Sequence, residues 1–132
     1  MRHPKAEAWE RRLREVFDSI DAELEAQYGG QYPLHPARPR HGTTAHPGHS
    51  GLFSVGAAFT AGYGSELGPG YVIDVDMVTL SDVPDEIEER IHDQVVERLR
   101  DELPRLFPGR NLQVTRDGRR FKIHGDLSLG TV

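Results

Sequence analysis

The residues with the clearest capacity for chemistry are histidines crowded into one short stretch. Four of the seven histidines lie between His35 and His49. Of these, His41, His46 and His49 carry imidazoles suited to zinc, nickel, copper or iron. The chain has no cysteine, so a metal would have to be held by His, Asp or Glu. Three such ligands with one open position would suit hydrolytic chemistry, and the expected cofactor is a divalent transition metal such as zinc.

These histidines belong to a segment, residues 29–50, whose composition predicts a loop. Four prolines and no acidic residue occur between Gln31 and Ser50. Proline removes a backbone donor and fixes φ, which excludes a helix or a central strand. A connection of about twenty residues without regular structure is typical of a binding loop or of a linker. The alternative to a metal site is therefore that these are ordinary surface histidines.

Two amphipathic helices are predicted on either side of the chain's centre. Residues 5–27 and residues 84–103 both place apolar side chains at intervals of three and four, with charges between them. Gly29 and Gly30 end the first helix, and Pro104 is expected to end or kink the second. The apolar stripes are Trp9, Leu13, Val16, Phe17, Ile20, Leu24 and Tyr28, and Ile87, Ile91, Val95, Leu99 and Leu103.

Four strands are predicted, in two hairpins. Residues 51–63 and 71–80 alternate apolar and small or polar side chains, with a glycine-rich turn between them. Asp117-Gly118 is a type I′ turn signal. Centring the turn there pairs Arg116 with Arg119, Val114 with Phe121, and Leu112 with Ile123.

The element order is thus α-β-β-α-β-β in a single domain, residues 1–132. We expect an α+β two-layer sandwich: a four-stranded antiparallel sheet with both helices on one face. This order resembles a circular permutation of the ferredoxin-like plait. The resemblance implies that the second and fourth strands lie side by side at the centre of the sheet, and it implies no function.

This arrangement predicts a site on the polar face of the sheet. Asp74 and Asp76 on the second strand would face His124 and Asp126 on the fourth, and the loop would fold over them. The predicted ligand or metal site consists of His41, His46, His49, Asp74, Asp76 and His124.

Composition limits the function classes. The chain has 21 acidic and 16 basic residues and a formal net charge of -5, which disfavours general binding to nucleic acid because phosphate attraction dominates that affinity. No apolar run is long enough to cross a membrane, and the cytoplasm is the expected compartment.

Two functions remain. The first is a small cytoplasmic protein, enzymatic or not, that binds a metal ion or small molecule between the loop and the polar sheet face. The alternative is a non-catalytic, homodimeric interaction module that uses the same face, with Leu52, Ala58, Val72 and Val78 in the interface.

Overall fold

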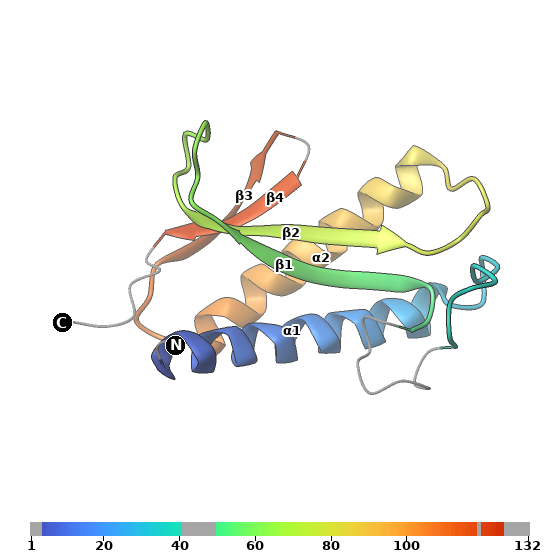
Figure 1. The fold of residues 1–132 in the computed structure, drawn as a ribbon, viewed down its shortest axis with the longest axis horizontal. Coiled ribbons are helices and arrows are strands. Elements are labelled where there is room, and N and C mark those ends of the chain that lie inside the picture. Colours follow the sequence, from blue (N-terminus) through green and yellow to red (C-terminus); the bar gives the residue numbers. More distant parts are fainter. Residues whose placement is uncertain (1–3, 41–49, 119, 126–132) are drawn as a thin grey trace.

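The computed structural model describes residues 4–40, 50–118 and 120–125. The order of elements is α-β-β-α-β-β, as predicted (Figure 1). The elements are α1 (Pro4–Tyr28), β1 (Phe53–Thr60), β2 (Gly70–Met77), α2 (Asp85–Leu106), β3 (Leu112–Asp117) and β4 (Arg120–Gly125).

The four strands form one antiparallel sheet in the order β1-β2-β4-β3. The second and fourth strands are therefore neighbours at the centre, and β1 and β3 are the two edges. This confirms the predicted α+β fold, and the strand order is the one that a circularly permuted plait requires. β4 is shorter than β2. The two strands pair only over Tyr71–Ile73 of β2.

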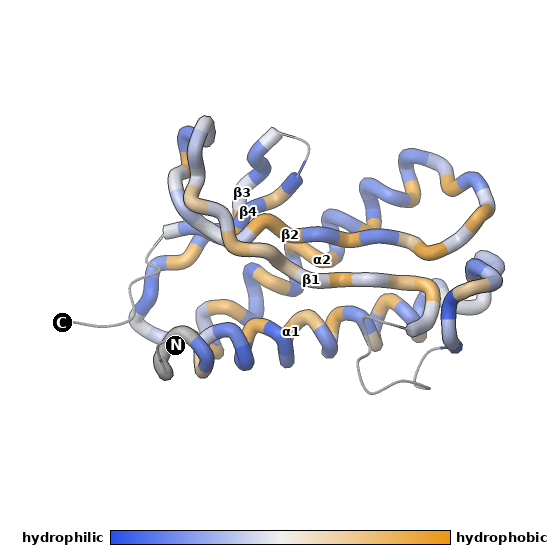
Figure 2. Tube along the Cα trace, in the orientation of Figure 1, coloured by the Kyte–Doolittle hydropathy of each residue, from blue (hydrophilic) through white to orange (hydrophobic). Residues whose placement is uncertain are grey.

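Both helices pack through the stripes that their spacing predicts. Every residue of the α1 stripe is buried, from Trp9 to Tyr28, and the α2 stripe is buried from Ile91 to Leu103. Figure 2 shows hydrophobic and hydrophilic positions alternating along both helices, as an amphipathic helix over a core requires. None of the described helices is both long enough and apolar enough to span a membrane.

Pro104 lies inside α2 and does not end it. The prediction that the helix ends at this residue was wrong, because the helix continues to Leu106; the alternative, a kink at Pro104, stays a prediction. In the last turn, the missing N–H of a proline removes one intrahelical hydrogen bond only. Burial of Leu103 and Phe107 on either side holds the backbone in place there.

The register of the C-terminal hairpin differs from the predicted one by two residues. Arg116 pairs with Phe121 and Val114 pairs with Ile123, so the pairing closes on Asp117 and Arg120. Because side chains alternate with a period of two, this shift leaves every residue on its predicted face. It also sets two buried residues, Val114 and Ile123, directly opposite each other in the core.

Candidate functional site

The structure separates the predicted site residues on the sheet. Asp74 lies beside Arg120, whose guanidinium is 2.8 Å from the carboxylate. The Nε2 atom of His124 lies 2.8 Å from the hydroxyl of Thr115 on β3. The pairing of Ile73 with Phe121 explains this, since it puts Asp74 at the start of β4 and His124 near its end. The expectation that Asp74 and Asp76 face His124 was wrong, and Asp126 lies outside the described residues.

The three loop histidines, His41, His46 and His49, also lie outside the described residues. Within the described ranges, no group of three His, Cys, Asp or Glu side chains is close enough to hold a metal ion. The metal site therefore stays a prediction.

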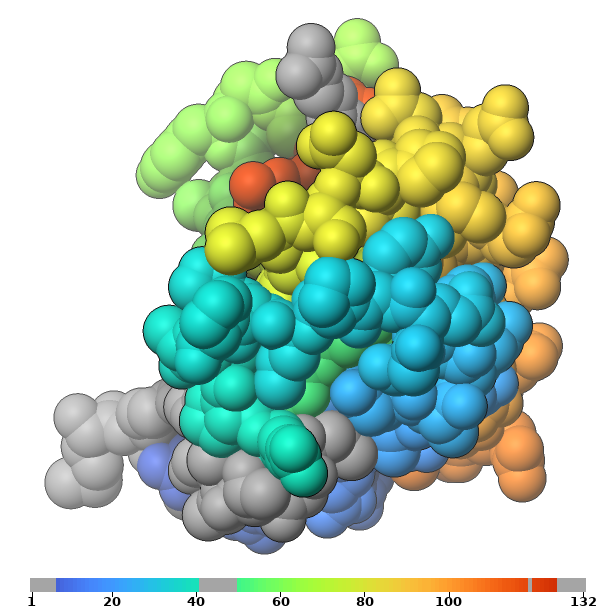
Figure 3. Space-filling view, turned by 90° about the vertical axis from the view of Figure 1, so that its right-hand side faces the viewer, coloured from blue at the N-terminus to red at the C-terminus, as the bar shows by residue number. Residues whose placement is uncertain are grey.

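The described part of the loop lies at the end of the sheet. The backbone N–H of His35 donates to the carbonyl of Val78 at 3.0 Å, and the hydroxyl of Thr79 donates to the carbonyl of Pro33 at 2.7 Å. Figure 3 shows this segment (cyan to teal) beside the connection that follows β2 (yellow). These bonds place residues 33–35 beyond the last residue of β2.

On the polar face of the sheet, the loop between β1 and β2 covers a lysine of β4. Lys122 is 1% exposed. Its ammonium donates to the carbonyl of Gly68 at 2.8 Å and to the hydroxyl of Ser65 at 2.9 Å, and lies 2.9 Å from the carboxylate of Asp117. The Ser65 hydroxyl in turn donates to Asp117 at 2.7 Å. We call these four residues the lysine clasp.

Two glycines allow the loop to close on Lys122. A Cβ atom on Gly70 would lie 2.9 Å from the side chain of Lys122 and 2.4 Å from the carbonyl oxygen of Ile123. Gly62 has φ +85, and a Cβ there would overlap the backbone of Gly68, so the loop needs glycine at both places. The loop between β1 and β2 accordingly stands beside the β3–β4 hairpin in Figure 1.

A second polar cluster lies between α1 and the start of β1. Asp21 is 1% exposed. Burial first, and then the negative charges of Glu25 and Asp18, raise the pKa of its carboxyl to about 7, against the opposing positive charge of Arg38. A carboxyl group in this setting binds a proton near neutral pH, because ionisation next to two other carboxylates costs free energy.

The same cluster fixes the chain where β1 begins. Both carboxylate oxygens of Glu25 accept the backbone N–H of Leu52 at 3.0 Å. Arg38 donates to the carbonyls of Gly51 and Phe53, both at 3.1 Å. Leu52 is 1% exposed, so it cannot take part in the interface predicted for it.

Two adjoining cavities run along the side of β2 that faces away from β1, past the end of its pairing with β4. We call the two cavities together the β2 trough. One, of about 180 Å³, is lined by Ile73, Asp74, Val75, Asp76, His92, Val95, Val96, Arg120 and Phe121. The other, of about 280 Å³, is lined by Val75, Asp76, Met77, Glu88, Ile91 and His92. The trough combines two predicted residues, Asp74 and Asp76, with His92 and Glu88 from α2. The sequence did not predict His92 and Glu88 as site residues, because helical spacing alone does not show which strand they approach.

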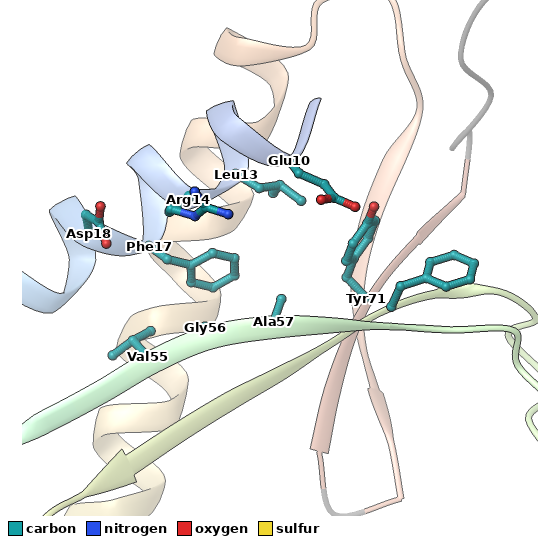
Figure 4. A pocket seen from close by; sticks show the side chains of 10 residues that line it. Glu10, Leu13, Arg14, Phe17, Asp18, Val55, Gly56, Ala57 and Tyr71 are labelled. Atoms are coloured by element: carbon teal, nitrogen blue, oxygen red, sulfur yellow. The ribbon is translucent and has the colours of Figure 1, made fainter. Parts of the chain in front are cut away.

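A further cavity, of about 300 Å³, opens between α1 and β1 (Figure 4). The apolar part of its lining comes from Leu13, Phe17, Val55 and Tyr71. Its charged residues, Glu10, Arg14 and Asp18, all come from α1, as Figure 4 shows. We call this space the α1–β1 cavity, and nothing in the alternation of β1 predicted it.

Comparison with known proteins places the chain in a family without assigning an activity. Residues 4–125 match a family model described as "Uncharacterised protein". The chain belongs to this family. A relative from Borreliella burgdorferi, itself described as an uncharacterised protein, is 38% identical over 121 residues, which cover 92% of this chain and 94% of the relative. No solved structure was found to match. The family match covers both helices and all four strands, so the clasp, the trough and the cavity all lie within the family region.

Replacing Lys122 with methionine should destabilise this family member. The substitution keeps most of the stem but leaves the Gly68 carbonyl without its donor and removes the cation beside Asp117, at a cost of about 1–3 kcal/mol. Urea denaturation would measure this loss. Arg90→Met, which removes an exposed cation from α2, is the control and should change the free energy of unfolding by less than about 0.5 kcal/mol.

The clasp should also weaken in acid. The hydrogen bond from Ser65, and next the one from Lys122, hold the pKa of Asp117 below its ordinary value of 3.8. Its contribution is therefore present above the unfolded pKa and is lost as pH falls through the lower folded value. The difference in stability between the wild type and Asp117→Asn should be constant above about pH 5 and shrink below pH 4. A difference that is the same at pH 3 and pH 7 would contradict the clasp.

The pH dependence of Asp21 has the opposite sign. Its folded pKa of about 7 exceeds the ordinary value of 3.8, so the folded state holds the proton more tightly. Stability then falls as pH rises from about 4 to about 7. Asp21→Asn removes this dependence and should be more stable than the wild type at pH 8, by up to about 4 kcal/mol. Thermal unfolding at pH 5 and pH 8 measures the effect, and equal gains at both values would count against a buried acid with a raised pKa.

Proposed function

We propose that this protein is a cytoplasmic, non-catalytic, homodimeric interaction module, and that two copies pair through the outer edges of their β1 strands. The observation that carries the proposal is an edge strand without charge or proline, on which the core-facing side chains of Ala57 and Phe59 are left exposed by the described residues. In the antiparallel pairing, two sheets of four strands would join across a two-fold axis into one sheet of eight.

The two edges of the sheet differ in how they resist such pairing. No Asp, Glu, Lys or Arg occurs between Arg40 and Glu66, so β1 is without charge and also without proline. The other edge strand, β3, carries Arg116 and Asp117 within its shorter length. Sheet edges exposed to water are normally protected by charges, proline or short length. Arg38 covers the carbonyl of Phe53 at the start of β1. From Ser54 onward β1 contains no charge and no proline and is longer than β3, which favours it as the surface that takes another strand.

Burial along β1 favours a second copy as the occupant. Phe53, Val55, Ala57 and Phe59 point to the same face, and the first two are buried under the helices whereas Ala57 is exposed and Phe59 is 61% exposed. The α1–β1 cavity lies where cover is lacking. In an antiparallel pair centred on Ala57, Phe59 of each copy would lie opposite Val55 of the other, beside the α1–β1 cavity that Val55 lines. Burying that ring would stabilise the dimer by roughly 1–2 kcal/mol per copy.

Charge supports the same choice. Each copy carries a net charge of -5, so two copies repel each other across most orientations. They meet with least repulsion along the uncharged β1 edge. Backbone hydrogen bonds and apolar side chains then supply the association.

Sedimentation equilibrium should give a mass of twice 14.8 kDa for the wild type. Ala57→Lys and Ala58→Lys each put a charge on exposed positions of β1, and should each shift the protein to the mass of one chain. Gln113→Lys makes the same kind of change on the exposed surface of β3 and should leave the dimer intact.

Two results would overturn the proposal. One is a wild-type protein that sediments as a single chain at all concentrations. The other is a dimer that survives both β1 variants but dissociates with Val72→Lys, which would return the interface to the open face of the sheet. Circular dichroism of each variant shows that its fold is kept.

A further inference from the structure

The edge of β2 that faces away from β1 is only partly used by the sheet. β4 pairs with Tyr71, Val72 and Ile73, and the Asp74–Arg120 ion pair marks the end of their contact. Among the described residues, no strand lies beside Asp74–Met77 on this side. Figure 1 shows β2 running on past the crossing with β4, with α2 alongside. Outward N–H and C=O groups of these residues are thus available to an added strand.

The cavities of the β2 trough lie along this same edge. The smaller is lined by Ile73, Asp74, Val75 and Asp76 in unbroken succession. Consecutive strand residues point to opposite faces, so a space that all of them line sits at the edge of the strand and on neither face. A guest strand placed there would continue the line of β4.

The two sides of the trough differ in chemistry. Toward the helices, its floor is apolar, since Ile91 and Val95 are buried there. Toward the open face lies Asp76, which is exposed and forms no ion pair with another described residue. Glu88 lines the end of the trough near the start of α2. The surrounding segment is strongly acidic, with nine acidic and four basic residues between Ser81 and Gly109.

We propose that the β2 trough binds an extended segment of a partner protein in which basic residues alternate with apolar ones. The guest would pair with the backbone of Asp74–Met77. Its apolar side chains would point toward α2, and its Lys or Arg side chains would lie beside Asp76. Successive side chains of a strand point to opposite faces, so a guest strand that fits the two unlike sides of the trough must alternate apolar and basic residues. The site is separated from β1 by the full width of β2, so it does not rest on the dimer.

The test uses the full chain and a short synthetic peptide that alternates lysine with valine. Isothermal titration at low salt should show binding, and the same peptide with glutamate in place of lysine should bind at least about tenfold more weakly. NMR hydrogen exchange should show added protection at the amides of residues 74–77.

Matched variants place the peptide. Asp76→Lys should weaken binding of the lysine peptide by about tenfold or more, because it replaces attraction with repulsion. Glu97→Lys makes the same change on the exposed surface of α2 and should alter the affinity by less than about threefold, the size expected of an exposed charge. Equal binding of both peptides, protection at β1 in place of β2, or equal effects of the two variants would each overturn the proposal. Because the Ala58→Lys variant keeps the trough, peptide binding can be measured on it whether or not the wild type is a dimer.

Discussion

The anchoring of residues 51–53 to Glu25 of α1 and to Arg38 of the following loop is the constraint on which the rest of the molecule depends. Glu25 holds the N–H of Leu52, and Arg38 holds the carbonyls of Gly51 and Phe53. These bonds bring the chain back from its long loop and set the position at which β1 starts. Near the anchor, Phe53 and Val55 are buried; farther along the strand, Ala57 and Phe59 are exposed. Because β1 is held against α1 only at its first residues, its later residues are less well covered, and the α1–β1 cavity opens there.

The lysine clasp plays the corresponding role on the opposite face. It ties the loop between β1 and β2 to both strands of the C-terminal hairpin, through Lys122 on β4 and Asp117 on β3. A buried ammonium is tolerated only when oxygen atoms replace its lost hydration, and the clasp supplies them from a carbonyl, a hydroxyl and a carboxylate. A loop therefore covers the sheet at this corner. Backbone groups are available for pairing at the two places where binding is proposed, the outer edge of β1 and residues 74–77 of β2. In a dimer, each assembly would present two troughs, so that a partner with two suitable segments would gain avidity.

The sequence predicts those features that arise from local periodicity. The stripes from Trp9 to Tyr28 and from Ile91 to Leu103 are buried as expected, and the element order leads to the observed sheet. Features that depend on contacts between distant segments could not be predicted. Ser65 and Lys122 lie far apart in the chain, and nothing in either segment shows that a glycine-rich loop folds onto a strand. The hairpin register followed turn chemistry in the prediction, whereas the structure follows the burial of Val114 opposite Ile123. The separate pairing of Ile73 with Phe121 between β2 and β4 explains why Asp74 meets Arg120 and not His124.

The central claim is that the β1 edge is the assembly surface of this protein. Hydrogen–deuterium exchange of the backbone amides, measured on dilute and on concentrated protein, tests it most directly because it reports each edge strand separately. The account predicts that exchange within Phe53–Thr60 slows as concentration rises, while exchange within Leu112–Asp117 stays the same. Exchange at β1 that is independent of concentration and as fast as exchange at the β3 edge would contradict it.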